Sequence, residues 1–521
     1  MSVFSQALTE TMDQEAKKQH ALTENGAVAK KTSGKALLDL NFALSSMRNM
    51  PDDKIWSMFL AAYNEDPVYA MIWLFFSRDP RGGAGERDTF RTIMARMADE
   101  NPNLIKKLLP LVPEYGRWDD LVWVMDHILS KTVQNAIKSL IYEQFKADMA
   151  ALKANKPVSL LGKWLPSNNA SSKDTLRRAE ILRSEFGLTP RQYRKALVAL
   201  RERIAIVESK MSANEWAEIA YPAVPSRAMM NYRDAFRRHD EERYDAYLTN
   251  VKEGKEKINS GVLFPHDIVH AYHVAGWRVK KDVDSTLEEQ WKALPNPIAD
   301  KPESSTLVVV DGSGSMSSPI GNTNISALEV ARAIGLFFAE RIEGEFNDTF
   351  ITFSSHPELV RLDHGLSLHA KLQVMDNYDD CSNTDIEKVF GLILKVAKEN
   401  HLPQDQLPAN ILIITDLEFD GLRDYWTYNR SVHDVDATLF ETIAERYAEE
   451  GYKLPRLVFW NVASRTNTIP ISENDLGVAL VSGFSPSIAD MVMSGETDPY
   501  KCLLAKLNSE RYAPVYQAVT A

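Results

Sequence analysis

The hydrophobic pattern of this chain changes its period near residue 300, and that change limits the folds open to it. Upstream, apolar residues recur every three or four positions, as at Leu37, Leu40 and Leu44, which is the spacing of one face of a helix. Downstream, short apolar runs at residues 306–310, 349–353, 411–414, 457–460 and 478–481 alternate with helical stretches such as residues 326–342. Short apolar runs that alternate with helices are typical of parallel strands buried between helices. We therefore expect an all-α part followed by an α/β part.

The 521 residues are expected to form three segments. Residues 1–33 are predicted to be a flexible N-terminal segment. Residues 34–295 are predicted to form an all-α domain of HEAT-like antiparallel helices, although no fixed-period sequence repeat is visible there. Prolines concentrate between residues 295 and 302, and residues 303–521 are predicted to form a doubly wound α/β domain. The predicted fold class is thus multidomain, with a helical-repeat half and an α/β half.

The net charge of −12 is divided unevenly between these halves. Residues 1–300 carry 43 Lys and Arg against 40 Asp and Glu, whereas residues 301–521 carry 17 against 32. Within the first part, residues 151–200 hold ten basic residues and three acidic ones. Such an asymmetry suggests two domains with different partners, although charges also cluster on solvated faces without any function.

Cysteine content and hydropathy indicate the compartment. The two cysteines, Cys381 and Cys502, cannot make a disulfide framework or a thiolate zinc site, and such a chain suits a reducing environment. The N-terminal residues are polar and lack the apolar core of a secretory signal. The most apolar run, residues 68–76, has about half of the roughly 20 residues that a membrane-spanning helix needs. We therefore expect a cytoplasmic protein without membrane contact.

Three short polar segments stand at the ends of predicted strands or before a predicted helix. Asp311-Gly-Ser-Gly-Ser-Met316 follows the first strand, Thr384 precedes a helix, and Asp416 follows a later strand. The carboxyl ends of parallel strands meet at one edge of a sheet, where open α/β folds bind ligands. Five oxygen-bearing side chains are therefore expected to converge there: Asp311, Ser313, Ser315, Thr384 and Asp416. Hydroxyl and carboxylate oxygens suit a hard divalent cation, so Mg²⁺ is the expected cofactor.

This set resembles the metal-ion-dependent adhesion site of von Willebrand factor A domains, whose pattern is D-x-S-x-S, then a Thr, then an Asp. The resemblance implies that Ser313, Ser315 and Thr384 bind the metal directly, and that Asp311 and Asp416 hold its waters. One coordination position would stay open, for the carboxylate of a partner protein or for a phosphate oxygen. Two plainer interpretations remain open: a Ser/Gly turn that only caps the next helix, or a metal that only braces the loops.

The helical half also carries family-like segments. A von Willebrand A domain placed after an all-helical half resembles the TROVE family, to which the Ro autoantigen belongs, and the segment Arg78-Asp-Pro-Arg-Gly-Gly-Ala-Gly-Glu-Arg87 resembles one of that family. A closer resemblance is to a related, uncharacterised domain-of-unknown-function family of plants, fungi and phages. Its hallmarks include Tyr115-Gly-Arg-Trp-Asp119 and Lys163-Trp-Leu-Pro166. The resemblance covers about residues 30–500.

TROVE proteins close their helices into a ring and bind small structured RNAs on a basic surface, so the resemblance implies an RNA partner here. Basic side chains can supply salt-dependent, largely sequence-independent affinity for phosphates. The candidate RNA-binding residues are Arg78, Arg81, Arg87, Lys163, Arg177, Arg178, Arg191, Arg194 and Lys195. Trp164 and Tyr193 could stack on an unpaired base. The near-neutral charge of the helical half counts against a dedicated nucleic-acid domain.

Our leading hypothesis from the sequence is a non-enzymatic RNA-binding protein with a Mg²⁺-holding A domain. The alternative is a protein-interaction scaffold whose metal captures an acidic side chain of a partner, without RNA. A third hypothesis, a metal-assisted phosphoryl hydrolase, lacks a visible general base. No zinc-site spacing, nucleophile elbow or phosphate-binding loop accompanies the motifs, so no catalytic residue is predicted.

Overall fold

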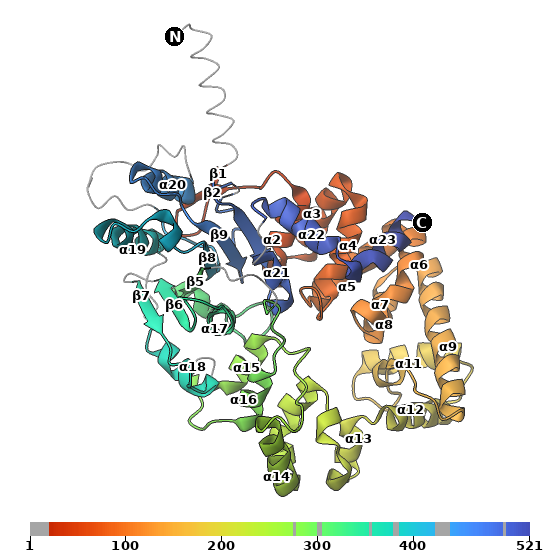
Figure 1. Ribbon diagram of the computed structural model, residues 1–521. Coiled ribbons are helices and arrows are strands. Elements are labelled where there is room, and N and C mark those ends of the chain that lie inside the picture. The colour runs from red at the N-terminus through yellow and green to blue at the C-terminus, as the bar shows by residue number, and fades with distance from the viewer. Residues whose placement is uncertain are drawn as a thin grey trace, which may run out of the picture. The chain divides into compact units, whose positions relative to one another are not determined.

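The computed structural model describes residues 20–274, 278–299, 305–353, 357–378, 385–421, 438–471, 473–492 and 496–521. The chain divides into two compact units. The sheet unit contains Met1–Tyr69 and Phe264–Asn508, and the helical unit contains Ala70–Leu263 and Ser509–Ala521. Figure 1 shows the elements of both units with their labels.

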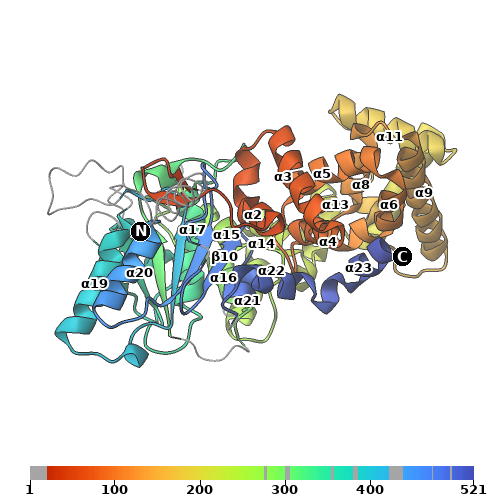
Figure 2. The same cartoon turned by 90° about the horizontal axis from the view of Figure 1, so that it is seen from above.

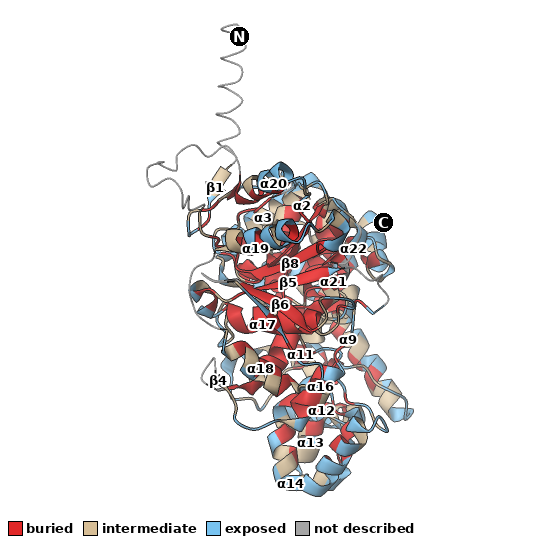
Figure 3. Ribbon diagram, turned by 60° about the vertical axis from the view of Figure 1, so that its left-hand side comes forward, coloured by how far each residue is buried: buried red, intermediate tan, exposed pale blue. Residues whose placement is uncertain are grey.

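The sheet unit is built on six strands in the order β10-β9-β8-β5-β6-β7. Neighbouring strands are parallel, except that β7 runs antiparallel to β6. The strands are β5 (Thr306–Asp311), β6 (Thr349–Phe353), β7 (Glu358–Arg361), β8 (Asn410–Thr415), β9 (Arg456–Asn461) and β10 (Val478–Ser482). Every residue of β5, β8, β9 and β10 is buried, which explains why these strands are continuous apolar runs in the sequence (Figure 3).

Helices cover both faces of this sheet. Phe459 and Trp460 are consecutive in β9 and so point to opposite faces. Phe459 packs against Phe440 of α20, and Trp460 packs against Phe338 of α17. The sheet unit contains α2 (Ala36–Phe42), α3 (Asp52–Glu65), α15 (Pro265–Tyr272), α16 (Ser285–Lys292), α17 (Ala327–Ala339), α18 (Leu368–Asp376), α19 (Ile386–Glu399), α20 (Leu439–Glu449), α21 (Ala489–Val492) and α22 (Pro499–Leu507). Figure 2 shows α19 and α20 side by side.

Short antiparallel hairpins complete the sheet unit. The first joins β1 (His20–Leu22) to β2 (Val28–Lys30), and the second joins β3 (His273–Val274) to β4 (Arg278–Val279). Residues 20–30, in the segment predicted to be flexible, are held by backbone hydrogen bonds between β1 and β2 and to later loops. Residues 1–19 lie outside the described part of the chain.

The helical unit holds amphipathic helices joined by short turns. They are α5 (Arg87–Glu100), α6 (Pro102–Leu108), α7 (Val112–Tyr115), α8 (Trp118–His127), α9 (Lys131–Lys153), α10 (Leu161–Trp164), α11 (Lys173–Glu185), α12 (Pro190–Ile204), α13 (Val207–Ser212), α14 (Ser226–Lys252) and α23 (Ala513–Thr520), with α4 (Pro67–Arg78) beginning in the sheet unit. Helix α12 starts at a capping box in which Thr189 and Gln192 satisfy each other's backbone N–H groups. Pro190 follows at the first helical position, as its fixed φ favours.

The expected combination of a helical part and an α/β part is confirmed, but the compact units do not divide at residues 295–303. Residues 34–69 and 264–295 are helical, yet they belong to the sheet unit. Helix α2 packs on the edge strand β10, and α15 packs on α17. The reason is physical: a sheet edge and a sheet face both need cover, and nearby helices supply it. The change of hydrophobic period therefore marks where the secondary structure changes. It does not mark the boundary between the two compact units.

Candidate metal centre and basic residues

The two predicted carboxylates emerge at the same edge of the sheet. Asp311 is the last residue of β5, and Asp416 directly follows β8. These strands are parallel neighbours, with Val310 opposite Ile414. The loop after β5 then turns through a short 3-10 helix, Gly314–Ser317, which returns its hydroxyl groups to the strand end.

Hydrogen bonds link three of the five predicted donors, and a fourth lies beside them. The Asp311 carboxylate accepts the backbone N–H of Ser313 at 2.9 Å, and the Ser313 and Ser315 hydroxyl oxygens lie 3.0 Å apart. The Ser315 hydroxyl group lies near enough to the Asp416 carboxylate to lower its pKa against the larger effect of burial. Thr384, the fifth predicted donor, lies outside the described residues. The structure therefore brings Asp311, Ser313, Ser315 and Asp416 into one cluster, which we call the metal edge.

Electrostatics favour a cation at the metal edge. Asp311 is fully buried and Asp416 is 1% exposed. Burial raises the pKa of both carboxyl groups, and the negative charge of Asp416 raises the pKa of Asp311 further. Two neighbouring buried carboxylates are costly unless a cation matches their charge.

The oxygen donors fit Mg²⁺ better than a softer metal. Across the described ranges, no three or more His, Cys, Asp or Glu side chains gather as a metal cluster. A cation at the metal edge would therefore depend on two carboxylates, two serine hydroxyl groups and water. Mg²⁺ keeps several waters and prefers such oxygen ligands. A cavity of about 20 Å³ beside Asp311, between α17 and β6, is large enough for one water molecule.

Two neighbours of the metal edge were not predicted from the sequence. The Thr415 hydroxyl group donates to the Asp311 carboxylate. The guanidinium group of Arg465, in the loop after β9, places Nη2 3.6 Å from Oδ2 of Asp416. Thr415 stands beside Asp416 in the sequence, so its position at the strand end was a usable signal. Arg465 gave no comparable signal, because it lies 49 positions further along the chain.

The first group of predicted RNA-binding arginines contains one buried and two exposed members. Arg78 is 3% exposed, and its guanidinium group binds the buried carboxylate of Asp120 at 2.8 Å. This corrects its assignment to an RNA-binding surface. Arg81 and Arg87 are exposed, and Arg87 lies 3.1 Å from the Asp88 carboxylate.

The glycines of this segment serve packing. A Cβ atom at Gly83 would come within 2.0 Å of the Phe76 carbonyl oxygen, and one at Gly116 within 2.5 Å of Asp120 Oδ2. In the same segment, Asp79 is fully buried and its carboxylate pairs with the guanidinium group of Arg511. Both family-like segments around Arg78 and Tyr115 are therefore built into the same packed turn and ion-pair network, which accounts for their residue types without a ligand.

The second group of predicted basic residues divides into paired and exposed members. Arg177 and Arg178 both bind the carboxylate of Asp126, so one acid neutralises much of their charge. Lys163 lies beside the Trp164 ring, with Nζ 5.5 Å from the ring centroid. Tyr193 is fully buried and donates to the Pro166 carbonyl oxygen, which corrects its prediction as a stacking residue.

The remaining three basic residues form an exposed row on α12. Arg191, Arg194 and Lys195 stand at the i, i+3 and i+4 positions of this helix, and all three are exposed. Among the described residues, none of the three has an ion-pair or side-chain hydrogen-bond partner. We call them the α12 row.

Two family models match this chain. A family described as domain of unknown function DUF7788 matches residues 305–510, and one described as domain of unknown function DUF2828 matches residues 172–303. The boundary between the two matches lies at the change of hydrophobic period.

Similarity to a protein sequence and to a solved structure extends over most of the chain. An uncharacterized protein of Acanthamoeba polyphaga mimivirus is 29% identical over 530 residues, which cover 95% of this chain and 88% of that protein. The crystal structure of the Deinococcus radiodurans RO (RSR) protein aligns with a TM-score of 0.44 and 16% identity, over 88% of this chain and 94% of that chain. No functional conclusion follows from a likeness of that size. Within the described residues, no helix is both long and apolar enough to cross a bilayer.

Proposed function

We propose that the sheet unit binds a divalent cation, Mg²⁺ by preference, at the metal edge and uses it to capture a carboxylate of a partner protein. One observation carries the proposal: two buried carboxylates at the ends of neighbouring strands lie within one cluster of hydroxyl groups. The cation would supply the missing positive charge and a position for an acidic ligand. The role is binding, and no residue is assigned to catalysis.

The chain's own residues divide this task. Ser313 and Ser315 offer neutral oxygen atoms that can contact the cation, while Asp311 and Asp416 supply the charge and can orient water molecules. Thr415 and the Ser313 backbone N–H hold the Asp311 carboxylate in place. Residues 301–521 carry an excess of acidic residues, so a polyanion such as RNA is disfavoured at this edge. A single carboxylate presented by a neutral or basic partner fits better.

Thermal unfolding with and without Mg²⁺ tests the metal edge. A ligand that binds only the folded state stabilises it by about 2.7 kcal/mol at a hundredfold excess over its Kd. We expect MgCl₂ to raise the melting temperature of the wild-type chain, and Asp311→Asn or Asp416→Asn to abolish that rise. Asp363→Asn is the matched control, because Asp363 is exposed in the same unit. A wild-type melting temperature that is the same in MgCl₂ and EDTA would refute the proposal.

A second candidate function is binding of small structured RNA by the helical unit. The observation in its favour is the α12 row, whose three cations face solvent without acidic partners among the described residues. Phosphate contacts by such a row give affinity that falls steeply with salt concentration. The charge-reversed variant Arg191→Glu/Arg194→Glu is expected to weaken RNA binding and to flatten its salt dependence. Binding that is unchanged in this variant would exclude the row.

A further inference from the structure

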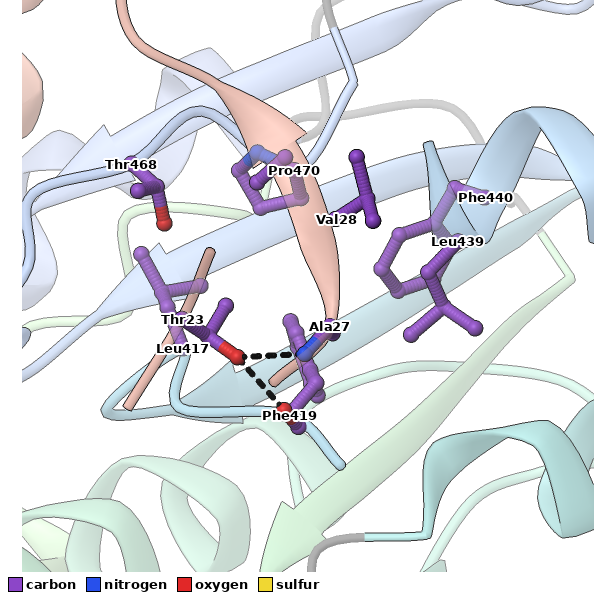
Figure 4. A pocket seen from close by; sticks show the side chains of 10 residues that line it. Thr23, Ala27, Val28, Leu417, Phe419, Leu439, Phe440, Thr468 and Pro470 are labelled. Carbon is purple, nitrogen blue, oxygen red and sulfur yellow. Dashed lines mark hydrogen bonds between the residues drawn. The ribbon is translucent and has the colours of Figure 1, made fainter. Parts of the chain in front are cut away.

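The turn of the first hairpin is docked beside the metal edge within the sheet unit. The Thr23 hydroxyl group donates to the Phe419 carbonyl oxygen at 2.6 Å (Figure 4). The Asn25 side chain donates to the Glu418 carbonyl oxygen at 2.6 Å. Further along, the backbones of Lys30 and Ile469 exchange two hydrogen bonds of 2.8 Å. The hollow between the hairpin and Phe419 leaves no room for a water molecule. The hairpin is therefore packed against the loops that follow β8 and β9.

A buried carboxylate fixes two of these segments relative to each other. Glu418 is fully buried, and its Oε2 atom accepts the backbone N–H of Glu24 at 2.7 Å. Its Oε1 atom accepts the backbone N–H groups of Arg465 at 2.8 Å and Thr466 at 3.0 Å. The backbones of Glu24 and Arg465 are thus held by the two oxygens of one carboxylate, which brings their side chains together.

Arg465 is shared between two acidic residues of very different exposure. Its Nε atom pairs with the Glu24 carboxylate, and its Nη2 atom lies 3.6 Å from Oδ2 of Asp416. The side chain of Glu24 is 55% exposed, whereas that of Asp416 is 2% exposed. One guanidinium group therefore links a solvent-facing carboxylate on the hairpin to a buried carboxylate of the metal edge.

We propose that Arg465 is a resident counter-ion of the metal edge, and that Glu24 sets how readily a divalent cation replaces it. This inference rests on the metal site proposed above. A cation at the metal edge and the Arg465 guanidinium group compete for the charge of Asp416, since two positive groups near one carboxylate repel each other. Glu24 relieves this competition, because Arg465 keeps an acidic partner when it leaves Asp416.

The inference predicts opposite effects for the two members of the pair. Arg465→Gln removes the competing charge and should tighten divalent-cation binding, by about twofold to fivefold for a partly exposed pair. Glu24→Gln leaves Arg465 with Asp416 alone and should weaken binding by a similar factor. The double variant should match Arg465→Gln, because Glu24 acts through Arg465. Arg465→Lys keeps the positive charge and should stay close to the wild type.

Calorimetric titration of the full chain with MgCl₂, repeated with MnCl₂, measures these Kd values. Lys398→Gln is the matched control, because Lys398 also belongs to a half-exposed ion pair, with Glu450, at the C-terminal ends of α19 and α20. Opposite shifts in Kd and a non-additive double variant support the inference. If the Kd values of the two single variants shift in the same direction, or do not shift, while the wild type still binds the cation, this inference is wrong and the proposed metal site stands. A wild type that binds no divalent cation overturns both this inference and the proposed metal site.

Discussion

Two clusters of buried carboxylates, one in each unit, differ in how their charge is matched. In the helical unit, Asp120 is fully buried, but its carboxylate accepts hydrogen bonds from Nε of Arg91 at 2.7 Å and from Nε of Arg78 at 2.9 Å. In the sheet unit, Asp311 and Asp416 are equally buried, and the guanidinium group of Arg465 approaches only Asp416, at 3.6 Å. A matched cluster holds a fold together, whereas an under-matched cluster leaves negative charge that an external cation would neutralise if it bound there. The comparison teaches that counter-charge, and not burial alone, separates a structural ion pair from a candidate binding site.

The largest expected effect comes from removing the matched carboxylate. Asp120→Asn would remove the negative charge that the buried guanidinium groups of Arg78 and Arg91 share, and would leave Arg91 with Asp119 alone. Breaking a buried pair in this way costs about 3–5 kcal/mol. Urea unfolding should show this loss, and a loss below about 1 kcal/mol would contradict the contrast between the clusters.

At the metal edge the same type of substitution should act in the opposite direction. In EDTA, Asp311→Asn removes one of two adjacent buried carboxylates and should stabilise the chain by about 1–2 kcal/mol. In saturating MgCl₂ the variant should lose its advantage, because the wild type then gains the energy of cation binding. Melting curves in the two buffers measure both effects. Destabilisation in EDTA of the size expected for Asp120→Asn would mean that the metal edge is already matched.

Another buried carboxylate, that of Glu329, is paired with histidine side chains. Glu329 of α17 accepts Nδ1 of His270 at 2.9 Å and Nδ1 of His273 at 3.0 Å. Burial raises the pKa of Glu329, but the hydrogen bonds from His270 and His273 outweigh burial and bring that pKa to about 2. The bond to Glu329 raises the pKa of His270, against the opposing effect of burial.

The directions of these two pKa shifts define the pH range in which the pair of Glu329 and His270 stabilises the fold. Glu329 contributes stability above its ordinary pKa of 4.5 and loses it as the pH falls toward 2. His270 contributes stability below its ordinary pKa of 6.5 and loses it as the pH rises through its raised value. The joint contribution is therefore greatest between about pH 4.5 and 6.5. His270→Gln should remove about 1 kcal/mol of stability at pH 5.5 and less at pH 8.5, and equal losses at both pH values would contradict this assignment.

The smallest effect on stability is expected for an exposed, already paired cation. Arg177 is half-exposed and shares Asp126 with Arg178. Arg177→Gln should leave the melting temperature nearly unchanged, because water and Arg178 replace its contact. If the helical unit binds RNA, this substitution should also reduce affinity less than Arg194→Gln in the α12 row. Filter binding with one RNA at two salt concentrations compares them, and equal losses would show that pairing with Asp126 does not reduce the role of Arg177.

Much of the sheet and of the metal edge was predictable, because the relevant signals are local. Residues 306–310, 349–353, 411–414, 457–460 and 478–481 were predicted as strands, and each lies within or coincides with an observed strand. Parallel pairing then brings Asp311 and Asp416 to one edge without further information. The edge strand β7 was missed because it is short and only one of its four residues is buried. Metal occupancy and the HEAT-like arrangement of the helices stay predictions.

The roles of the arginines were not predictable, because they depend on distant partners. Arg78 looked like a surface cation, but Asp120, 42 positions away, receives it in the interior. No motif in the sequence included Arg465, but the fold places its side chain between those of Glu24 and Asp416.

By itself the sequence determined the order of strands and helices and the edge at which the oxygen donors gather, since hydrophobic period and strand direction are properties of short segments. Only the tertiary structure decided which charges are neutralised and which remain open to a ligand. Charge matching acts through space over a few ångströms, between residues that the chain separates by tens or hundreds of positions.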